Sequence, residues 1–366
     1  MRLRTAIAEH KRRHGERYPA ERPTTVGAFT GDGGRLVHIG PDGDAHDCSY
    51  ALSSVGGTDR IQIGIAGGGG IRWLADLETT RQHYDGDTPL VETEYDAGRY
   101  TIHQFDLVVD DVHLTHVVLR GAPPADADLV ASCAFAPDMA EGRVGNLVHE
   151  EAGPDGGDVV EVFHRREHDF LTASTGLSAA HGQRQTSIGQ LLGEGGGAPH
   201  RGEIDEREDT SLTPDVVVRA PFERDGRTER VTLVSRTVVD DEPTGSGPRP
   251  GDAGEQIGDR LAEDAVRDRR LAAVSQTAAA HADTDSIRAA AAERAPSVPD
   301  AVPRQETVAS DLRVLELLTA ESGGRIAGPE FDPFYAASGG YGYTWFRDEA
   351  EASSALLAAS EELGLD

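Results

Sequence analysis

Alternating apolar and polar residues dominate the chain from about residue 25 to residue 240. The pattern is clearest in residues 99–109, RYTIHQFDLVV, and residues 112–120, VHLTHVVLR, which flank a turn at Asp110-Asp111. A period of two is typical of a strand with one buried face. Similar segments separated by Gly, Asp and Pro occur at 35–40, 60–66, 71–78, 128–136, 158–165, 215–223 and 230–239. Short strands at this spacing predict a large antiparallel β-sandwich.

The pattern changes after residue 240. Residues 240–255, DDEPTGSGPRPGDAGE, combine Pro, Gly and acidic residues and mark a boundary. Alanine-rich, charged sequence continues to about Glu293 and predicts one or two exposed linker helices, and three prolines in 295–303 end the linker. We therefore divide the chain into a sandwich domain (1–245), a linker with helices (246–304) and a C-terminal segment (305–366).

The C-terminal segment contains two stretches with helical spacing of apolar residues. Gly323-Gly324 ends the first stretch, and Asp348-Glu349 stands at the start of the second, where acidic residues favour a helix N-terminus. The apolar positions are Val308, Leu312, Leu315 and Leu318 in the first, and Ala352, Ala355, Leu356, Ala359 and Leu363 in the second. A mainly β fold followed by helices is therefore expected, with the leucine faces of these two helices left as an open interface.

Residues 339–348, GGYGYTWFRD, lie between these two helices and carry the most specific chemistry of the chain. The aromatic residues near this stretch are Phe331, Phe334, Tyr335, Tyr341, Tyr343, Trp345 and Phe346. An aromatic plane can stack on the C–H face of a pyranose, while a guanidinium and a carboxylate, here Arg347 and Asp348, can bind its hydroxyls. The alternative interpretation is an aromatic core cluster beside a surface ion pair.

Residues 312–351 resemble the start of the catalytic domain of glucoamylase-type enzymes, glycoside hydrolase family 15. The resemblance rests on a helix, a Gly- and Ala-rich turn at 323–333 and a Gly-Gly-Tyr-x-Tyr-x-Trp-x-Arg-Asp loop at 339–348. It implies a super-β-sandwich ahead of an (α/α)₆ toroid of twelve helices, of which this chain would supply the first two. Such an enzyme is an inverting hydrolase that releases terminal glucose from α-glucans.

The resemblance also implies roles for individual residues. Tyr341 would lie near the reacting sugar, Trp345 would form part of the pocket wall, and Arg347 and Asp348 would hydrogen-bond the outer hydroxyls of the terminal glucose. Phe346 departs from the proline or threonine expected between Trp and Arg. Both catalytic glutamates of the family lie well downstream of this loop. We therefore expect the catalytic residues beyond Asp366, and a chain that holds a truncated catalytic domain without its acid and base.

Several functions remain open at this point. The loop would read a terminal α-glucose, so trehalase and dextran glucosidase activities stand beside glucan 1,4-α-glucosidase. The alternative from another class is a non-catalytic remnant or accessory β-sandwich that binds glucan or a partner chain. The expected partners are an α-glucan or another α-glucoside, and a second chain carrying the rest of the toroid, with no cofactor.

The charge of the chain points to its environment. The formal net charge is −29, from 64 acidic residues against 34 arginines and the single Lys11. An acidic surface with almost no lysine is what we expect of a halophilic protein, because molar salt reduces the screening length to about 3 Å. No basic stripe favours nucleic acid. No window of eighteen apolar residues is present, and the N-terminus has no apolar run after its basic residues, so we expect a cytoplasmic protein away from membranes.

Three other sequence features are expected to have structural roles only. His164-Arg165-Arg166-Glu167-His168 has the H-x-x-E-H pattern of zinc peptidases, but its apolar flanks predict two strands joined by a turn and no metal site. The glycine runs at 67–70 and 195–197 lack the residues of a phosphate loop and are expected to be flexible. Cys48 and Cys133 are expected to be buried, reduced thiols.

Overall fold

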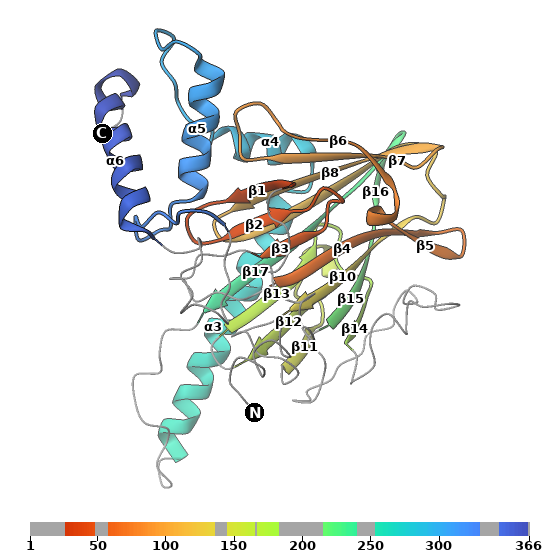
Figure 1. Ribbon diagram of the computed structural model, residues 1–366. Helices are drawn as coiled ribbons and strands as arrows, with labels where there is room; N and C mark the ends of the chain where they lie inside the picture. Colours follow the sequence, from red (N-terminus) through yellow and green to blue (C-terminus); the bar gives the residue numbers. More distant parts are fainter. Residues whose placement is uncertain are drawn as a thin grey trace, which may run out of the picture.

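Two antiparallel sheets form the body of the protein in the computed structural model (Figure 1). The structure describes residues 26–47, 58–135, 145–164, 167–182, 215–239, 253–329 and 344–364. The first sheet, sheet A, has the strand order β1-β2-β3-β4-β10-β15-β14, with β5 paired to β4. Its strands are β1 (Ala28–Gly31), β2 (Leu36–Ile39), β3 (Ala45–Asp47), β4 (Thr58–Gly67), β5 (Gly70–Trp73), β10 (Asp128–Phe135), β14 (Ala179–Gly182) and β15 (Asp215–Pro221).

The second sheet, sheet B, has the order β11-β12-β13-β17-β9-β8-β7-β6, with β16 paired to β17. Its strands are β6 (Glu78–Tyr84), β7 (Val91–Asp96), β8 (Tyr100–Val109), β9 (Val112–Gly121), β11 (Gly145–His149), β12 (Val159–His164), β13 (Glu167–Ala173), β16 (Glu223–Asp225) and β17 (Thr228–Val239). Alternate residues of both sheets, such as Ile63 of β4 and Leu119 of β9, meet in one buried cluster. The predicted β-sandwich is therefore confirmed.

The hairpin of β8 and β9 follows the sequence closely. Asp110 and Asp111 both have positive φ angles, 49° and 62°, and Val109 lies opposite Val112 in the ladder. Two left-handed residues between paired strands form the turn whose twist matches that of a β-hairpin, and Asp tolerates this conformation better than most residues. The predicted strand at 71–78 is wrong in one respect: a 3₁₀ turn, η3 (Leu74–Asp76), divides it between β5 and β6.

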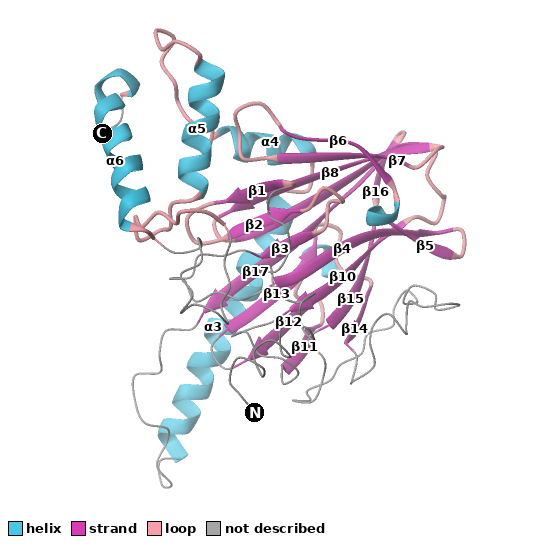
Figure 2. Ribbon diagram, viewed as in Figure 1, coloured by secondary structure: helices cyan, strands magenta, loops and turns pink. Residues whose placement is uncertain are grey.

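Two helices cover the outer face of sheet B, the face turned away from sheet A. These are α3 (Ala253–Ala280) and α4 (Thr284–Ala292), drawn behind the strands in Figure 2. Their buried residues Leu271, Val274, Ala278, Ile287 and Ala291 share a cluster with outer-face residues of sheet B, among them Phe105, Leu114 and Phe170. The expectation of exposed linker helices is thus wrong for the part of the chain that forms this cluster. Alanine at the contact lets a helix approach the sheet closely, so a composition typical of a solvated helix also suits a buried one.

The last two described helices are α5 (Gln305–Leu317) and α6 (Phe346–Leu363). Leu317, Ala320 and Ile326 pack against Leu36 of β2, which ties the end of α5 to sheet A. Of the leucines predicted to form an open interface, Leu312, Leu315, Leu318, Leu356 and Leu363 are all half-buried. The large apolar residues exposed on the two helices are instead Val314, Phe346 and Leu357.

Figure 1 shows α6 beside α5, at the edge of the molecule and away from both sheets. An ion pair of 3.3 Å between Arg325 Nη1 and Glu349 Oε1 ties its first turn to the segment that follows α5. No described helix combines the length and the apolar character that a membrane-spanning segment needs.

Candidate functional site

The predicted sugar-binding residues lie at the start of α6. Trp345 is the N-cap residue, with an extended backbone (φ −99°, ψ 127°), and Asp348 and Glu349 occupy the first turn. Trp345 is 40% exposed and Phe346 is 94% exposed. Three of the four predicted residues, Trp345, Arg347 and Asp348, therefore stand on one accessible helix end, which we call the α6 edge. Tyr341 lies outside the described residues.

Charged groups of opposite sign are available at the α6 edge. The Arg347 and Asp348 side chains are 74% and 43% exposed, and Arg347 Nη2 lies 3.8 Å from Asp348 Oδ2. An exposed ion pair at this distance contributes little to stability, so the two groups are not committed to holding the helix. Among the residues that the structure describes, neither has another ion-pair partner. Both can therefore exchange their mutual contact for hydroxyl groups of a ligand.

The neighbouring Glu349 has the structural role. Its Oε1 accepts hydrogen bonds from Arg325 Nη1 at 3.3 Å and from the Ser353 hydroxyl at 2.8 Å. Its backbone N–H donates to the Trp345 carbonyl at 2.9 Å. Glu349 thus fixes the orientation of the first turn and leaves Asp348 facing outward. Together the α6 edge offers an aromatic plane, a guanidinium fork and a carboxylate, which can form one wall of a polar binding site.

A buried carboxylate that the sequence did not reveal lies under α3. The Oε2 atom of Glu161 receives His149 Nε2 at 2.6 Å and lies 3.2 Å from Arg267 Nε, and its Oε1 atom receives His168 Nδ1 at 2.6 Å. Burial raises the pKa of Glu161, but the two imidazole hydrogen bonds and the charge of Arg267 outweigh it and leave a pKa of about 2. Both oxygens are occupied, so Glu161 links three strands to α3 and is a poor candidate for a catalytic base.

The H-x-x-E-H segment adopts the arrangement that its flanks predict. β12 ends at His164 and β13 begins at Glu167, and these two residues lie opposite each other in an antiparallel pair. The imidazole of His168 bonds Glu161 on β12. The prediction of two strands is confirmed, and the helical spacing that a zinc peptidase needs does not arise here.

A second group of possible ligands lies on sheet B. One ligand atom each from His83, Glu92 and Glu94 fall within 4.8 Å of one another. Glu92 also accepts a hydrogen bond from His103 Nδ1 at 2.8 Å and lies 3.8 Å from Arg288 Nη2 of α4. Burial raises the pKa of Glu92, and its His103, His83 and Arg288 neighbours lower it to a net value below the usual range. A guanidinium already compensates this carboxylate, so we assign Glu92 to holding α4 on the sheet.

The predicted burial of the cysteines is confirmed for Cys133, which is a free, buried thiol on β10, whereas Cys48 lies outside the described residues.

The model of a family described as a domain of unknown function, DUF7997, matches residues 1–249. No curated protein matches the sequence. A solved structure of a bacterial glucoamylase complexed with acarbose is similar, with a TM-score of 0.57 and 10% identity over 92% of this chain. This likeness concerns the fold. The chain spans 48% of the length of that glucoamylase.

A polysaccharide lyase is also found, with a TM-score of 0.30 and 9% identity over 59% of this chain and 32% of its own. The fold-level relation to glucoamylase extends across the sandwich and into the helices that follow it, since it covers more of the chain than residues 1–249.

Proposed function

For this chain, which belongs to the DUF7997 family, we propose a role in recognising α-glucosides as the N-terminal part of a glucoamylase-type glycoside hydrolase. The chain would supply the β-sandwich, the helices that cover it and the first two helices of an (α/α)₆ toroid. The whole enzyme would release terminal glucose from α-glucans with inversion, using a pair of carboxylates as acid and base. The domain division at about 245 and 305 belongs to this proposal.

One observation carries the proposal: Trp345, Arg347 and Asp348 are exposed together at the start of α6. A helix whose only function was packing would place an indole and a phenyl ring such as Phe346 against a core. Here the aromatic surface remains accessible beside a weak ion pair. That arrangement suits the C–H face and hydroxyl rim of a terminal glucose. The likeness of the fold to a glucoamylase supports the same ligand class.

Tryptophan fluorescence tests the proposal because the chain has only two tryptophans, Trp73 and Trp345. The full chain is titrated in molar KCl with acarbose, maltose, trehalose and isomaltose. We expect a saturable change in emission with a dissociation constant in the millimolar range, about −4 kcal/mol, because the α6 edge is open to solvent on one side. The change should disappear in Trp345→Phe, which removes the reporter and leaves the signal of Trp73 as a background.

Two variants separate recognition from adventitious quenching. Arg347→Ala and Asp348→Asn each remove a charge-assisted hydrogen bond, worth about 1.5–3 kcal/mol, and should weaken binding roughly tenfold or more. The matched control is Arg81→Ala, since Arg81 is also exposed and lies 4.0 Å from an acidic partner, Glu94, on β6 and β7. The proposal fails if no glucoside gives a saturable signal, or if Arg81→Ala weakens binding as much as Arg347→Ala.

The choice among the four sugars then identifies the linkage. Preference for maltose and acarbose supports a glucan 1,4-α-glucosidase, preference for trehalose supports a trehalase, and preference for isomaltose supports a dextran glucosidase. Melibiose, which differs from isomaltose only in having galactose at its non-reducing end, should bind more weakly than isomaltose if Arg347 and Asp348 hydrogen-bond the hydroxyl pattern of glucose.

A second candidate function follows from a different observation. Phe346 is 94% exposed and Leu357 is 77% exposed on the same helix, α6. Apolar side chains exposed in this way are typical of a contact with another polypeptide. An accessory β-sandwich that docks a partner chain through α6 would need these residues and not Arg347. Loss of an assembly, measured by light scattering, in Phe346→Ser and Leu357→Ser but not in Arg347→Ala would support this function over sugar recognition.

A further inference from the structure

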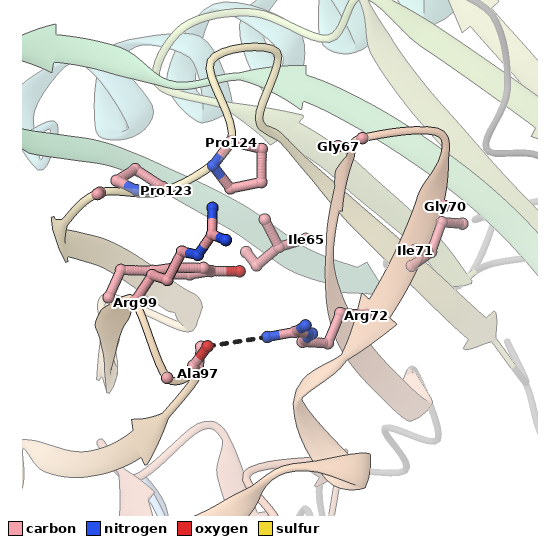
Figure 3. Close-up of a pocket in the computed structure, with 13 residues that line it drawn as sticks. Ile65, Gly67, Gly70, Ile71, Arg72, Ala97, Arg99, Pro123 and Pro124 are labelled. Atoms are coloured by element: carbon pink, nitrogen blue, oxygen red, sulfur yellow. Dashed lines mark hydrogen bonds between the residues drawn. The ribbon is translucent and has the colours of Figure 1, made fainter.

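A pocket of about 680 Å³ lies at the end of the sandwich opposite α6. Its walls come from three places that are distant in sequence: the hairpin of β4 and β5, the turn between β7 and β8, and the segment that joins β9 to β10 (Figure 3). Its volume is in the range of small-molecule sites in proteins. Sheet A supplies one wall and sheet B the opposite wall, so the pocket opens where the two sheets separate.

The lining of the pocket is unusual for so acidic a chain. Two arginines, Arg72 and Arg99, line it, and its lining residues include no aspartate and no glutamate. The whole chain has 64 acidic residues and a net charge of −29. The two guanidinium groups therefore place positive charge in the lining, while the carboxylates of Asp96 and Asp126 beside the pocket accept the backbone N–H groups of Gly98 and Gly68. Such a concave positive site attracts an anion against the field of the rest of the surface.

The two arginines differ in how they are held. Arg72 Nη1 donates a hydrogen bond of 3.0 Å to the carbonyl of Ala97, which fixes its guanidinium across the pocket and leaves its other N–H groups available. The guanidinium of Arg99 has no ion-pair or hydrogen-bond partner among the residues that the structure describes, and only the backbone of this residue is bonded, to Ala97 and Ala122. Figure 3 shows Arg72 extending toward Ala97, and Arg99 extending from the opposite wall toward Pro124. Arginine is suited to this task because its fork of donors matches the oxygens of a phosphate or carboxylate.

The other walls are apolar and tightly built. Ile65, Ile71, Pro123 and Pro124 line the pocket around the arginines. Gly67 allows the β4–β5 hairpin to approach this wall, because a Cβ atom there would lie 2.7 Å from Pro124 Cβ. The next residue donates its backbone N–H to Asp126 at 3.1 Å, so that carboxylate is engaged by the hairpin. The pocket is thus a recess whose lining combines these apolar side chains with the two arginines and exposed backbone.

We propose that this pocket binds a small organic anion whose phosphate or carboxylate group lies between Arg72 and Arg99 and whose apolar part packs against Ile71, Pro123 and Pro124. The site is independent of the α6 edge and does not depend on the function proposed there. Binding at the two sites can be measured separately, because neutral sugars are the ligands proposed for the α6 edge and organic anions are the ligands proposed for this pocket.

Calorimetry on the full chain in 1 M KCl tests the proposal, since the screening length is then about 3 Å and only contact charges contribute. The probes are phenyl phosphate and benzoate, with inorganic phosphate as the head group alone and benzyl alcohol as the uncharged body. We expect phenyl phosphate or benzoate to bind at least tenfold more tightly than benzyl alcohol and than inorganic phosphate. The better of the two probes identifies the head group.

Variants decide whether the pocket is the site. Arg99→Ala should weaken binding at least tenfold, and Arg99→Lys should recover part of the loss, because an ammonium keeps the charge without the fork. Arg72→Ala should also weaken binding. Because this variant loses the hydrogen bond from Arg72 to Ala97 and can disturb the hairpin, Arg99→Ala is the decisive variant. Arg81→Ala is the control for a general loss of charge. Absence of saturable binding by both organic anions, or an equal loss in Arg81→Ala, would overturn the proposal.

Discussion

Removing the side chain of Ile287 tests whether α3 and α4 belong to the folded body. Ile287 is completely buried on α4 and packs in the cluster that joins this helix to the outer face of sheet B. Truncation of a buried isoleucine to alanine removes three methyl or methylene groups and leaves a cavity, at a cost of about 2–5 kcal/mol. We expect Ile287→Ala to fall within this range, because Phe105 and Phe170 on the rigid sheet cannot move to fill the space.

The neighbouring residue provides a matched control. Arg288 is partly exposed, its Nε lies 2.7 Å from Asp85 Oδ2, and its guanidinium lies 5.4 Å from the centre of the Phe105 ring. The ion pair with Asp85 is exposed, and the contacts of Arg288 with the Phe105 ring and, at 3.8 Å, with Glu92 are each worth about 1 kcal/mol, so Arg288→Ala should cost less than the upper part of the range for Ile287→Ala and should leave no cavity.

Urea unfolding in molar KCl measures the two costs, and hydrogen exchange shows whether α4 alone opens. If Ile287→Ala changed neither the unfolding midpoint nor the exchange of the α4 amides, α4 would not be docked on sheet B in solution. The interpretation of this region as a linker, rather than as a cover for the sheet, would then be restored.

Three further predictions concern charge. The pKa of Glu161 is about 2, below the ordinary value of 4.5, so its ionised form stabilises the folded state. The stability advantage of the wild type over Glu161→Gln should be complete above pH 5 and should fall by about 3 kcal/mol toward pH 2. Unfolding curves of the two proteins at several pH values measure this difference. Burial raises the pKa of Asp32 from 3.8 to about 6, against the hydrogen bond from the Asp111 N–H and the charge of Arg294. The free energy of unfolding of the wild type should therefore fall as pH rises from 4 to 6. Over the same range Asp32→Asn should become about 3 kcal/mol more stable relative to the wild type. A stability difference between the two proteins that does not change with pH would contradict this prediction. With a net charge of −29, the chain should lose compactness between molar and about 0.1 M KCl, and a melting temperature independent of salt in circular dichroism would count against a halophilic origin.

The sequence was sufficient to predict the sandwich because its signals are local. The alternation in residues 99–120 and the two aspartates at the turn specify a hairpin without reference to the rest of the chain. The sequence could not show that sheet B is buried on both faces. His116 has the polar character of a solvent-facing position, yet its Nδ1 bonds Thr232 at 2.8 Å and its Nε2 bonds Thr284 of α4 at 3.0 Å. The polar character of His116 suggests a solvent-exposed position. In the structure this side chain instead contacts Thr284, a helix residue 168 positions further along the chain.

The candidate sites divide in the same way. The α6 edge consists of consecutive residues, so its members could be named from the sequence, and the structure adds their exposure and the part played by Glu349. The pocket between Arg72 and Arg99 could not be predicted, because it depends on the close approach of two hairpins from different sheets. The only local signal was the glycine run at 67–70, which has the composition of a flexible loop. Its first glycine is in fact needed for contact with Pro124.

The position of the two candidate sites limits how they can interact. The α6 edge and the arginine pocket lie at opposite ends of the molecule, with the two-sheet core between them (Figure 1). A ligand at one site can influence the other only if the structure between them has two arrangements with different affinities. The inner core between the sheets is closely packed, and α3 and α4 cover the outer face of sheet B, which favours one arrangement. The contact of α6 is different, because within the described part of the chain the ion pair that ties its first turn to the segment after α5 is Arg325–Glu349. Any change on ligand binding is therefore expected at α6 itself rather than in the sandwich or the pocket.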